Sequence, residues 1–292
     1  SSSSPSAASP SSIRCQSDAP TLPGRLAVPC VCSELIEDMA VAASEHTVLT
    51  LNACLLPTHL RWIFRAHRLL FCETIERAAE RVADALIFHH CMAPFDTVHM
   101  QEVFEECAFD VIVRRMREIG LVHTTGFARS GLCTFSSHSV RVIFERETKS
   151  LGEVRPKAWQ AVELGAAVHV NLHFASEIDG SHAGRMAQAA ELGQWVSGRL
   201  RASDPPTYLL VIGDTNEGSG EQYAALATTM GVRPKQHLPA SYWWLRGLVA
   251  ARFDRAFLFW PPQGSSEADE PWEEGAELKG RVVSELPDVS DH

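Results

Sequence analysis

The chain has 292 residues, of which 45% are apolar, enough for a substantial hydrophobic core in one large domain or two small ones. Its 26 Lys and Arg against 36 Asp and Glu give a net charge of −10. This balance disfavours a nonspecific polyanion binder, because Lys and Arg make most contacts to a phosphate backbone, although it is compatible with a local basic site.

The eight cysteines are scattered without a repeating spacing. Cys30 and Cys32 are too close for the usual zinc knuckle, and no second pair follows them. We therefore expect most cysteines to be buried thiols in a reducing compartment. No apolar run reaches the length of a membrane-spanning helix. Because the chain begins with Ser and stops at His292, we expect it to be a fragment of a longer protein.

Residues 1–45 are predicted to be a disordered Ser-, Pro- and Ala-rich leader followed by a linker or short helix, and residues 46–292 to be the globular part. Apolar, β-prone runs alternate there with segments of helical periodicity. Strands are predicted at 47–52, 97–100, 132–137, 140–145, 158–164, 166–174, 208–212 and 250–259, and helices at 65–88, 108–119 and 183–200. An acidic loop is predicted at 264–277. Strands interleaved with helices, plus a central run of strands, favour a two-sheet α/β sandwich.

Polar side chains follow several of these apolar runs. They are Asn52, Gln101-Glu102, Asn171 with His173, and Asp214 with Asn216, and the pair Asp291-His292 ends the chain. A hydrophobic strand buries its own length, so polar groups at strand ends can converge on one site at the sheet edge. This set of carboxylates, carboxamides and imidazoles indicates metal-assisted hydrolysis of a phosphoester.

The carboxylates have distinct roles in this interpretation, each with a plain alternative. Mg²⁺ is often held by one or two carboxylates plus substrate phosphate, so Glu102 alone is sufficient, although it can equally be a solvated strand end. Asp214 and Asn216 would point the same way on an extended backbone. The alternative is an ordinary turn, since Gly-Asp-x-Asn is turn-forming.

The imidazoles are the candidate proton-transfer groups. His173 can hydrogen-bond a developing phosphorane or transfer a proton, and His292 can act as a base oriented by Asp254. Any single one of the 13 histidines can instead be a surface or packing residue. The whole set, in this order, is far more specific than any member of it.

The order LN…QEV…SGL…NxHx…GDxN…SDH resembles the endonuclease/exonuclease/phosphatase superfamily over about residues 46–292. Within that superfamily the chain is most similar to neutral sphingomyelinases. The residues that carry this similarity are NACLLP at 52–57, Arg65 and Arg68, SGLCTFS at 130–136, Lys157, and Arg185 with Gln188.

The resemblance implies a DNase I-like, four-layered α-β-β-α sandwich of two mixed sheets, whose final core strand would follow His292 and is missing from the sequence. It implies Mg²⁺-dependent hydrolysis of sphingomyelin to ceramide and phosphocholine. Glu102 would bind Mg²⁺, with Asn52 beside it or on the phosphate, and Lys157 would contact the substrate. His173 and Asn216 would stabilise the phosphorane, and Asp214 would position or deprotonate groups opposite the metal. His292 would activate water, with Asp254 and Asp291 orienting it or completing the metal shell.

Two alternatives remain open at this point. One is another phosphoester hydrolase of the superfamily, an inositol phosphate phosphatase or an endonuclease, although the negative charge disfavours nucleic acid. The other is a catalytically lapsed scaffold, motivated by Leu172, Thr215 and Arg255, where the family has other residues. A sphingomyelin or related phospholipid substrate implies peripheral membrane contact, and we expect the protein to be cytoplasmic. Trp243-Trp244-Leu245 is either its interfacial wedge or part of the core.

Overall fold

The structure is a computed structural model that describes residues 46–55, 74–148, 157–176, 182–217, 220–231, 242–244, 249–251, 254–259 and 261. Residues 54, 148, 220–223, 242–244, 249–251, 254 and 255 are described by their backbone alone. All belong to one unit of the chain, His46–His292. The predicted leader and linker, Arg65 and Arg68, and the acidic loop at 264–277 lie outside the described residues.

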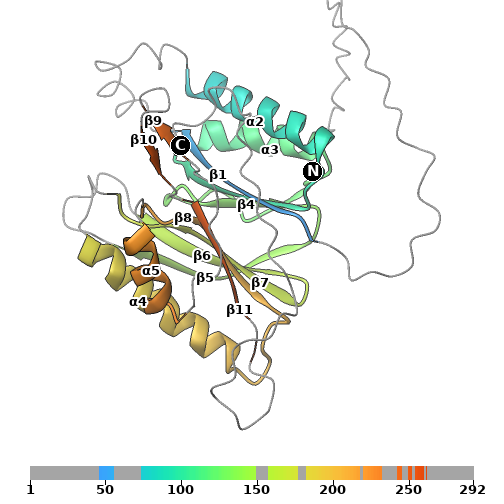
Figure 1. The fold of residues 1–292 in the computed structure, drawn as a ribbon. Helices are drawn as coiled ribbons and strands as arrows, with labels where there is room; N and C mark the ends of the chain where they lie inside the picture. The colour runs from blue at the N-terminus through green and yellow to red at the C-terminus, as the bar shows by residue number, and fades with distance from the viewer. Residues whose placement is uncertain are drawn as a thin grey trace, which may run out of the picture. The chain divides into compact units, whose positions relative to one another are not determined.

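The first sheet carries the earliest strands and is covered by two helices. Its four strands have the order β1-β2-β4-β3, with β1 and β2 parallel and the other pairs antiparallel. The strands are β1 (Val48–Leu55), β2 (Thr97–Val103), β3 (His123–Thr124) and β4 (Cys133–Ser136). Helices α2 (Ile75–Met92) and α3 (Glu106–Glu118) lie together on its outer face (Figure 1).

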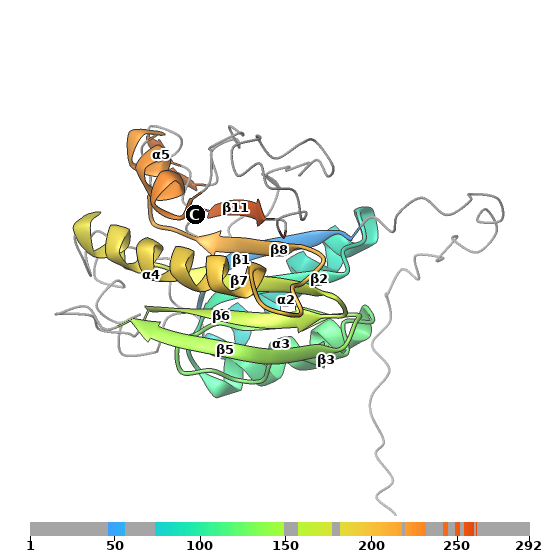
Figure 2. The same cartoon turned by 90° about the horizontal axis from the view of Figure 1, so that it is seen from below.

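The second sheet has five strands in the order β11-β8-β7-β6-β5, with only β7 and β8 parallel among its described pairs. The strands are β5 (Val140–Thr148), β6 (Lys157–Leu164), β7 (Ala167–His173), β8 (Leu209–Asp214) and β11 (Asp254–Phe259). Helices α4 (His182–Leu200) and α5 (Gly220–Thr229) flank it (Figure 2). A separate antiparallel pair consists of β9 (Tyr242–Trp244) and β10 (Val249–Ala251).

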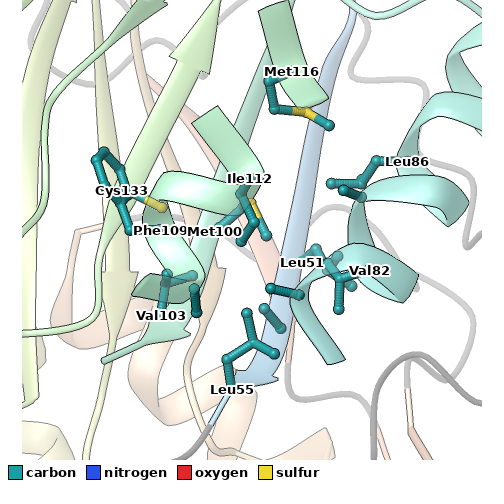
Figure 3. Close-up of a cluster of buried hydrophobic side chains, with 14 of the residues drawn as sticks. Leu51, Leu55, Val82, Leu86, Met100, Val103, Phe109, Ile112, Met116 and Cys133 are labelled. Atoms are coloured by element: carbon teal, nitrogen blue, oxygen red, sulfur yellow. The ribbon is translucent and has the colours of Figure 1, made fainter. Parts of the chain in front are cut away.

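Each sheet has its own hydrophobic core on the face that its helices cover. Val98 and Met100 of β2 pack against α2 and α3 in the first core, part of which is drawn in Figure 3. Val170 and Leu172 of β7 pack in the second core, which α4 and α5 complete. Each fully buried aliphatic side chain contributes about 1.5–3 kcal/mol relative to an exposed one, so the helices are held to their sheets mainly by this burial.

Between the two sheets lies a buried layer of polar side chains, contributed by the alternate residues of the same strands. The side-chain contacts that cross it include His99 Nε2 to His169 Nδ1 at 3.1 Å, Gln101 Nε2 to Asn171 Oδ1 at 2.7 Å, and Asn52 Nδ2 to Asp214 Oδ2 at 3.0 Å. A buried polar group left without a partner costs about 1–3 kcal/mol, so the two sheets must face each other in the register that pairs these groups.

The predicted four-layered α-β-β-α sandwich is confirmed by this arrangement, while several element boundaries differ. Helix α2 begins at Ile75, where the Thr74 hydroxyl accepts a hydrogen bond from the Arg77 amide, and it ends four residues beyond the predicted 88. The single strand predicted at 250–259 is wrong: its first part is β10 and its last part is β11, in different sheets. Strand β3 and helix α5 were not predicted.

The cysteine prediction is wrong for two of the three described free thiols. Cys91 and Cys107 are exposed, in the last turn of α2 and the first turn of α3, and only Cys133 is buried. Burial raises the pKa of the Cys133 thiol. Within the described part of the chain, no helix combines the length and apolar character needed to cross a bilayer.

Histidines fill the end of the polar layer formed by the beginnings of β2 and β7. His99 also bonds Thr134 at 2.9 Å, His169 lies 3.3 Å from the Tyr208 hydroxyl, and the His46 ring lies beside that of His169. Burial lowers the pKa of His99 to about 3 and that of His169 well below its usual value. Burial also lowers the pKa of His46, against the opposing effect of the nearby Asp96 carboxylate. These rings are therefore neutral in the folded protein near pH 7.

We predict that acidification destabilises the fold through these histidines. In the unfolded chain a histidine takes up a proton near pH 6.5, whereas folded His99 does so only near pH 3. As pH falls below about 6.5 the unfolded state binds more protons, and stability is lost progressively down to the folded pKa. Between about pH 7.5 and about pH 5.5, His99 should account for a loss of stability on the order of 1 kcal/mol, measured by urea unfolding.

The variant His99→Gln should show a smaller loss of stability between these two pH values than the parent protein. His123, which is exposed, provides the matched control, since His123→Gln should leave the loss unchanged. An equal loss in the parent and in His99→Gln would contradict the prediction.

Candidate functional site

Six of the predicted site residues come together at one edge of the polar layer. They are Asn52 from β1, Glu102 from β2, Lys157 from β6, His173 from β7, and Asp214 with Asn216 at the end of β8. The C-terminal ends of parallel strands meet at this edge, and β6, which runs antiparallel to β7, contributes its first residue. These six residues thus lie together at one sheet edge, and Lys157 joins the strand-end residues from the start of its strand.

The sequence predicted Glu102 just past the second strand, whereas the structure places it within β2. Its backbone is left-handed, with φ of 61°, which is uncommon for a residue with a side chain. Gly131 packs against it: a Cβ on this glycine would lie 3.2 Å from the Glu102 Cα and 2.6 Å from the Phe104 ring. A held left-handed conformation costs about 1–3 kcal/mol and is characteristic of functional positions.

Lys157, His173 and Glu102 form a compact charged group. Lys157 Nζ lies 2.8 Å from His173 Nε2 and 3.7 Å from Glu102 Oε1, and His173 Nε2 lies 3.5 Å from the same Glu102 oxygen. The Glu102 side chain is 12% exposed and the other two are more deeply buried. His173 Nε2 therefore faces one ammonium group and one carboxylate of this group at the same time.

Asp214 is fully buried, and donors hold both of its carboxylate oxygens. The Asn52 side-chain amide donates to Oδ2 at 3.0 Å across the two sheets, and the Asn216 backbone N–H donates to Oδ1 at 2.8 Å. His173 Nε2 lies 3.7 Å from Oδ2. The orientation of this carboxylate is therefore fixed by both the polar layer and the turn that follows β8.

The predicted extended spacing of Asp214 and Asn216 is wrong, and the alternative turn is present instead. Strand β8 ends at Asp214, and Asn216 is left-handed with φ of 53°. The Asn216 side-chain amide donates to the Phe174 carbonyl at 2.8 Å, which ties the loop after β8 to the loop after β7. The turn wins because Asp214 can accept a hydrogen bond from the backbone two residues ahead.

The three remaining predicted residues are only partly described. The backbone of Asp254 pairs with that of Asp214 in the β11–β8 ladder, which places it at the same edge of the sheet, and nothing is described of its side chain. Asp291 and His292 lie outside the described residues. Their predicted roles, like those of the six residues above, stay predictions.

The residues fit a Mg²⁺ ion in their chemistry. Among the described residues, no three His, Cys, Asp or Glu side chains group as a metal centre. Mg²⁺ needs fewer protein ligands than that, since it keeps several waters and uses one or two carboxylates. The partly exposed Glu102 carboxylate is a suitable oxygen ligand, and Asn52 pairs in β1 with Gln101, the neighbour of Glu102.

Two sets of contacts that support the site were not predicted. Gln101 and Asn171, which the sequence placed in the converging polar set, cross-link the two sheets, and Asn171 also donates to the carbonyls of Met100 and Cys133. Buried Glu217 bonds buried Arg185 directly behind Asn216. The one sequence signal for Glu217 is a charged residue immediately after the Gly-Asp-Thr-Asn turn.

No protein-family model matches the sequence, and no curated protein matches it. Solved structures share the fold. A β-hairpin deletion mutant of beta toxin from Staphylococcus aureus aligns with a TM-score of 0.57 at 13% identity, over 81% of this chain and 98% of that chain. Sphingomyelinase C from Streptomyces griseocarneus aligns with a TM-score of 0.55 at 16% identity, over 73% and 83%. SmcL aligns with a TM-score of 0.54 at 15% identity, over 74% and 83%.

The chain has the DNase I-like fold. The fold named by the sequence resemblance is thereby confirmed. At these identities the likeness extends to the DNase I-like fold alone, and the chemistry of this chain has to be argued from its own residues.

We predict that the site edge depends on Gly213. Its φ is 139°, and a Cβ there would lie 2.2 Å from the Leu172 carbonyl oxygen on the neighbouring strand. Gly213→Ala should therefore lower the free energy of unfolding by at least about 3 kcal/mol. Gly198 in α4 is the matched control, because a Cβ there meets open space, and Gly198→Ala should raise stability by about 0.5–1 kcal/mol. Equal urea midpoints for the two variants would contradict this account.

Proposed function

We propose that this protein is a Mg²⁺-dependent phosphodiesterase that hydrolyses sphingomyelin to ceramide and phosphocholine. The observation that carries the proposal is the cluster of Glu102, Lys157, His173 and Asp214, in which the His173 Nε2 atom lies within 3.7 Å of the other three groups. Buried ionisable groups that face one another at a sheet edge are characteristic of catalytic sites. Proteins with the same fold include one named sphingomyelinase C, which supports the choice of substrate.

The site supplies positive charge and hydrogen-bond donors to a phosphodiester. The Lys157 ammonium group stabilises negative charge that develops on the non-bridging oxygens as phosphorus becomes pentacoordinate. Asn216 adds a carboxamide at the same edge, held in place by its turn. Bound Mg²⁺, with Glu102 and Asn52 as its protein ligands, would supply Lewis-acid neutralisation of the phosphate charge.

His173 and Asp214 organise proton transfer in this proposal. The water oxygen forms a bond to phosphorus, the bond from phosphorus to the ceramide oxygen breaks, and that oxygen takes up a proton. His173 faces Lys157, Glu102 and Asp214 through Nε2, so it can accept and return a proton at that atom. His292, oriented by Asp254 and Asp291, is the proposed base that activates the water.

One of the substitutions that motivate the scaffold alternative lies away from the reacting edge. Leu172 is fully buried in the second hydrophobic core, among side chains that face α4. This side chain therefore gives no reason to expect a lapsed site. A phospholipid substrate also leads us to propose a cytoplasmic protein that contacts membranes peripherally, with the Trp243-Trp244-Leu245 side chains outside the described residues.

We predict Mg²⁺-dependent release of phosphocholine from sphingomyelin. Sphingomyelin, phosphatidylcholine, an inositol phosphate and abasic DNA are each supplied with Mg²⁺ or with EDTA. Glu102→Gln should lower kcat on sphingomyelin about 10²–10³-fold, because the carboxylate charge is lost. Glu106, exposed in the first turn of α3, is the control, and Glu106→Gln should keep the activity. Turnover of the inositol phosphate or DNA alone would assign a different substrate, and no turnover by the folded protein would favour the scaffold.

Lys157 should be needed for the chemical step. Lys157→Met keeps the length of the side chain but removes the cation, so kcat should fall about 10²–10³-fold, and thermal stability should also fall because Glu102 loses its nearby cation. Lys157→Arg keeps the charge but changes the donor geometry and should recover only part of the rate. Arg141 on β5 is the control because it is exposed and forms an ion pair with Glu163. The variant Arg141→Met should leave kcat unchanged. Full activity in Lys157→Met would exclude a role for this ammonium group.

A further inference from the structure

Helix α4 reaches the candidate site through two polar side chains on its buried face. Arg185 is 1% exposed, and its Nε donates to Glu217 Oε1 at 2.6 Å while its Nη1 donates to the Ala175 carbonyl at 3.3 Å. Gln188, one turn further along, accepts a hydrogen bond from the Ala175 amide at 3.1 Å. Together Arg185, Gln188 and Glu217, here called the α4 clasp, join the helix to the loops that follow β7 and β8.

The α4 clasp holds the chain at the residue that follows Asn216. Glu217 is fully buried and is the next residue after Asn216, whose side-chain amide is bonded to the Phe174 carbonyl, beside Ala175. The two loops are thus bonded both to each other and to the helix. Asn216 in turn donates its backbone N–H to Asp214. A continuous series of contacts leads from Arg185 to the Asp214 carboxylate.

Stability alone does not account for a buried ion pair at this place. The desolvation of two charges offsets much of their attraction, and well-packed apolar side chains of similar volume usually stabilise a protein at least as well. Helix α4 already packs through Ala189, Leu192 and Val196 in the second core. The guanidinium and the carboxylate instead orient the loop, because a charged hydrogen bond fixes the position of the group it binds.

The backbone of Asn216 needs such fixing. Its left-handed φ of 53° costs free energy and persists only where the surroundings determine it. The Glu217 carboxylate is held by Arg185, and His182 Nδ1 lies 3.0 Å from the same Glu217 oxygen at the partly exposed rim of the loop. Glu217, the residue after Asn216, is therefore held in place by contacts with two other side chains.

We propose that Arg185 and Glu217 are positioning residues that hold Asn216, and through it Asp214, in the geometry required for catalysis. The inference rests on the proposed phosphodiesterase function. It states that the ion pair acts on the rate of the chemical step through the turn after β8, without touching the substrate.

The test uses Arg185→Met, Glu217→Gln and the double variant, each compared in kcat, KM and thermal unfolding. Each single variant leaves a buried charge without its partner and should lose both stability and kcat. The double variant has no unpaired charge and should recover much of the stability. Its kcat should nevertheless stay about 10- to 100-fold below the parent, with KM changed less than about twofold, because the turn is no longer held.

Glu191 provides the matched control on the same helix. It forms an exposed ion pair with Arg146 at 2.7 Å, and such a pair contributes little, so Glu191→Gln should keep the parent values of kcat and stability. If the kcat of the double variant recovers together with its stability, the ion pair supports only the fold and the inference is overturned.

Amide hydrogen exchange over residues 213–217 separates this inference from the proposed function. Exchange there should be at least about tenfold faster in the double variant than in the parent or in Glu191→Gln, because the local opening free energy falls. Unchanged exchange would overturn the inference whatever the activity. Faster exchange in a protein that hydrolyses no phosphoester would refute the phosphodiesterase proposal and the catalytic role, while keeping the α4 clasp as the group that orders the turn.

Discussion

The two sheets of this protein face each other through buried polar side chains, and the remaining structure depends on how those side chains pair. Alternation along each strand sends apolar residues outward to the helices, so each sheet has its own hydrophobic core. The facing surfaces are left with hydroxyl, carboxamide and imidazole groups, each of which needs a partner. Apolar surfaces would tolerate sliding, whereas the Gln101–Asn171 and Asn52–Asp214 hydrogen bonds allow one register. The Asn52–Asp214 bond is also part of the candidate site, so the packing of the two sheets against each other also sets the geometry of the site.

The polar layer changes in charge from one end to the other. At the end where β2 and β7 begin, it consists of neutral rings, and burial lowers the pKa values of His99 and His169. At the end where the strands finish, it contains Glu102, Lys157 and Asp214, which are charged groups with partners within a few ångströms. Burying a charge is acceptable only where opposite charges or donors surround it. Charge therefore collects at the edge, where Glu102 retains some exposure to solvent and a charged substrate can approach.

The sequence was sufficient for the parts that depend on local pattern. Period-two alternation predicted strands such as 158–164 and 166–174, and the rule that strand ends converge predicted that Asn52, Glu102, His173 and Asp214 meet. It was insufficient where a distant residue decides the outcome. The left-handed Glu102 depends on Gly131, a partner that no local window contains. The Arg185–Glu217 pair likewise joins a helix to a loop beyond the next strand, and the split of 250–259 into β10 and β11 reflects which sheet each half joins.

Backbone strain and its support explain why the site needs more than its reacting groups. Of the residues that the structure describes, the non-glycine residues with positive φ are Glu102 and Asn216, both in the candidate site. Each conformation costs free energy that contacts elsewhere must offset. At Glu102 the neighbour is Gly131, where a Cβ would lie 3.2 Å from the Glu102 Cα and 2.6 Å from the Phe104 ring, so a larger residue would force these neighbours to shift. At Asn216 the support is electrostatic, from a buried guanidinium and carboxylate behind the turn. A Cβ at Gly131 would displace its neighbours, whereas the Arg185–Glu217 pair can be replaced on both sides together without leaving an unpaired charge, so the turn after β8 is the part of the site whose geometry can be tuned with less loss of stability.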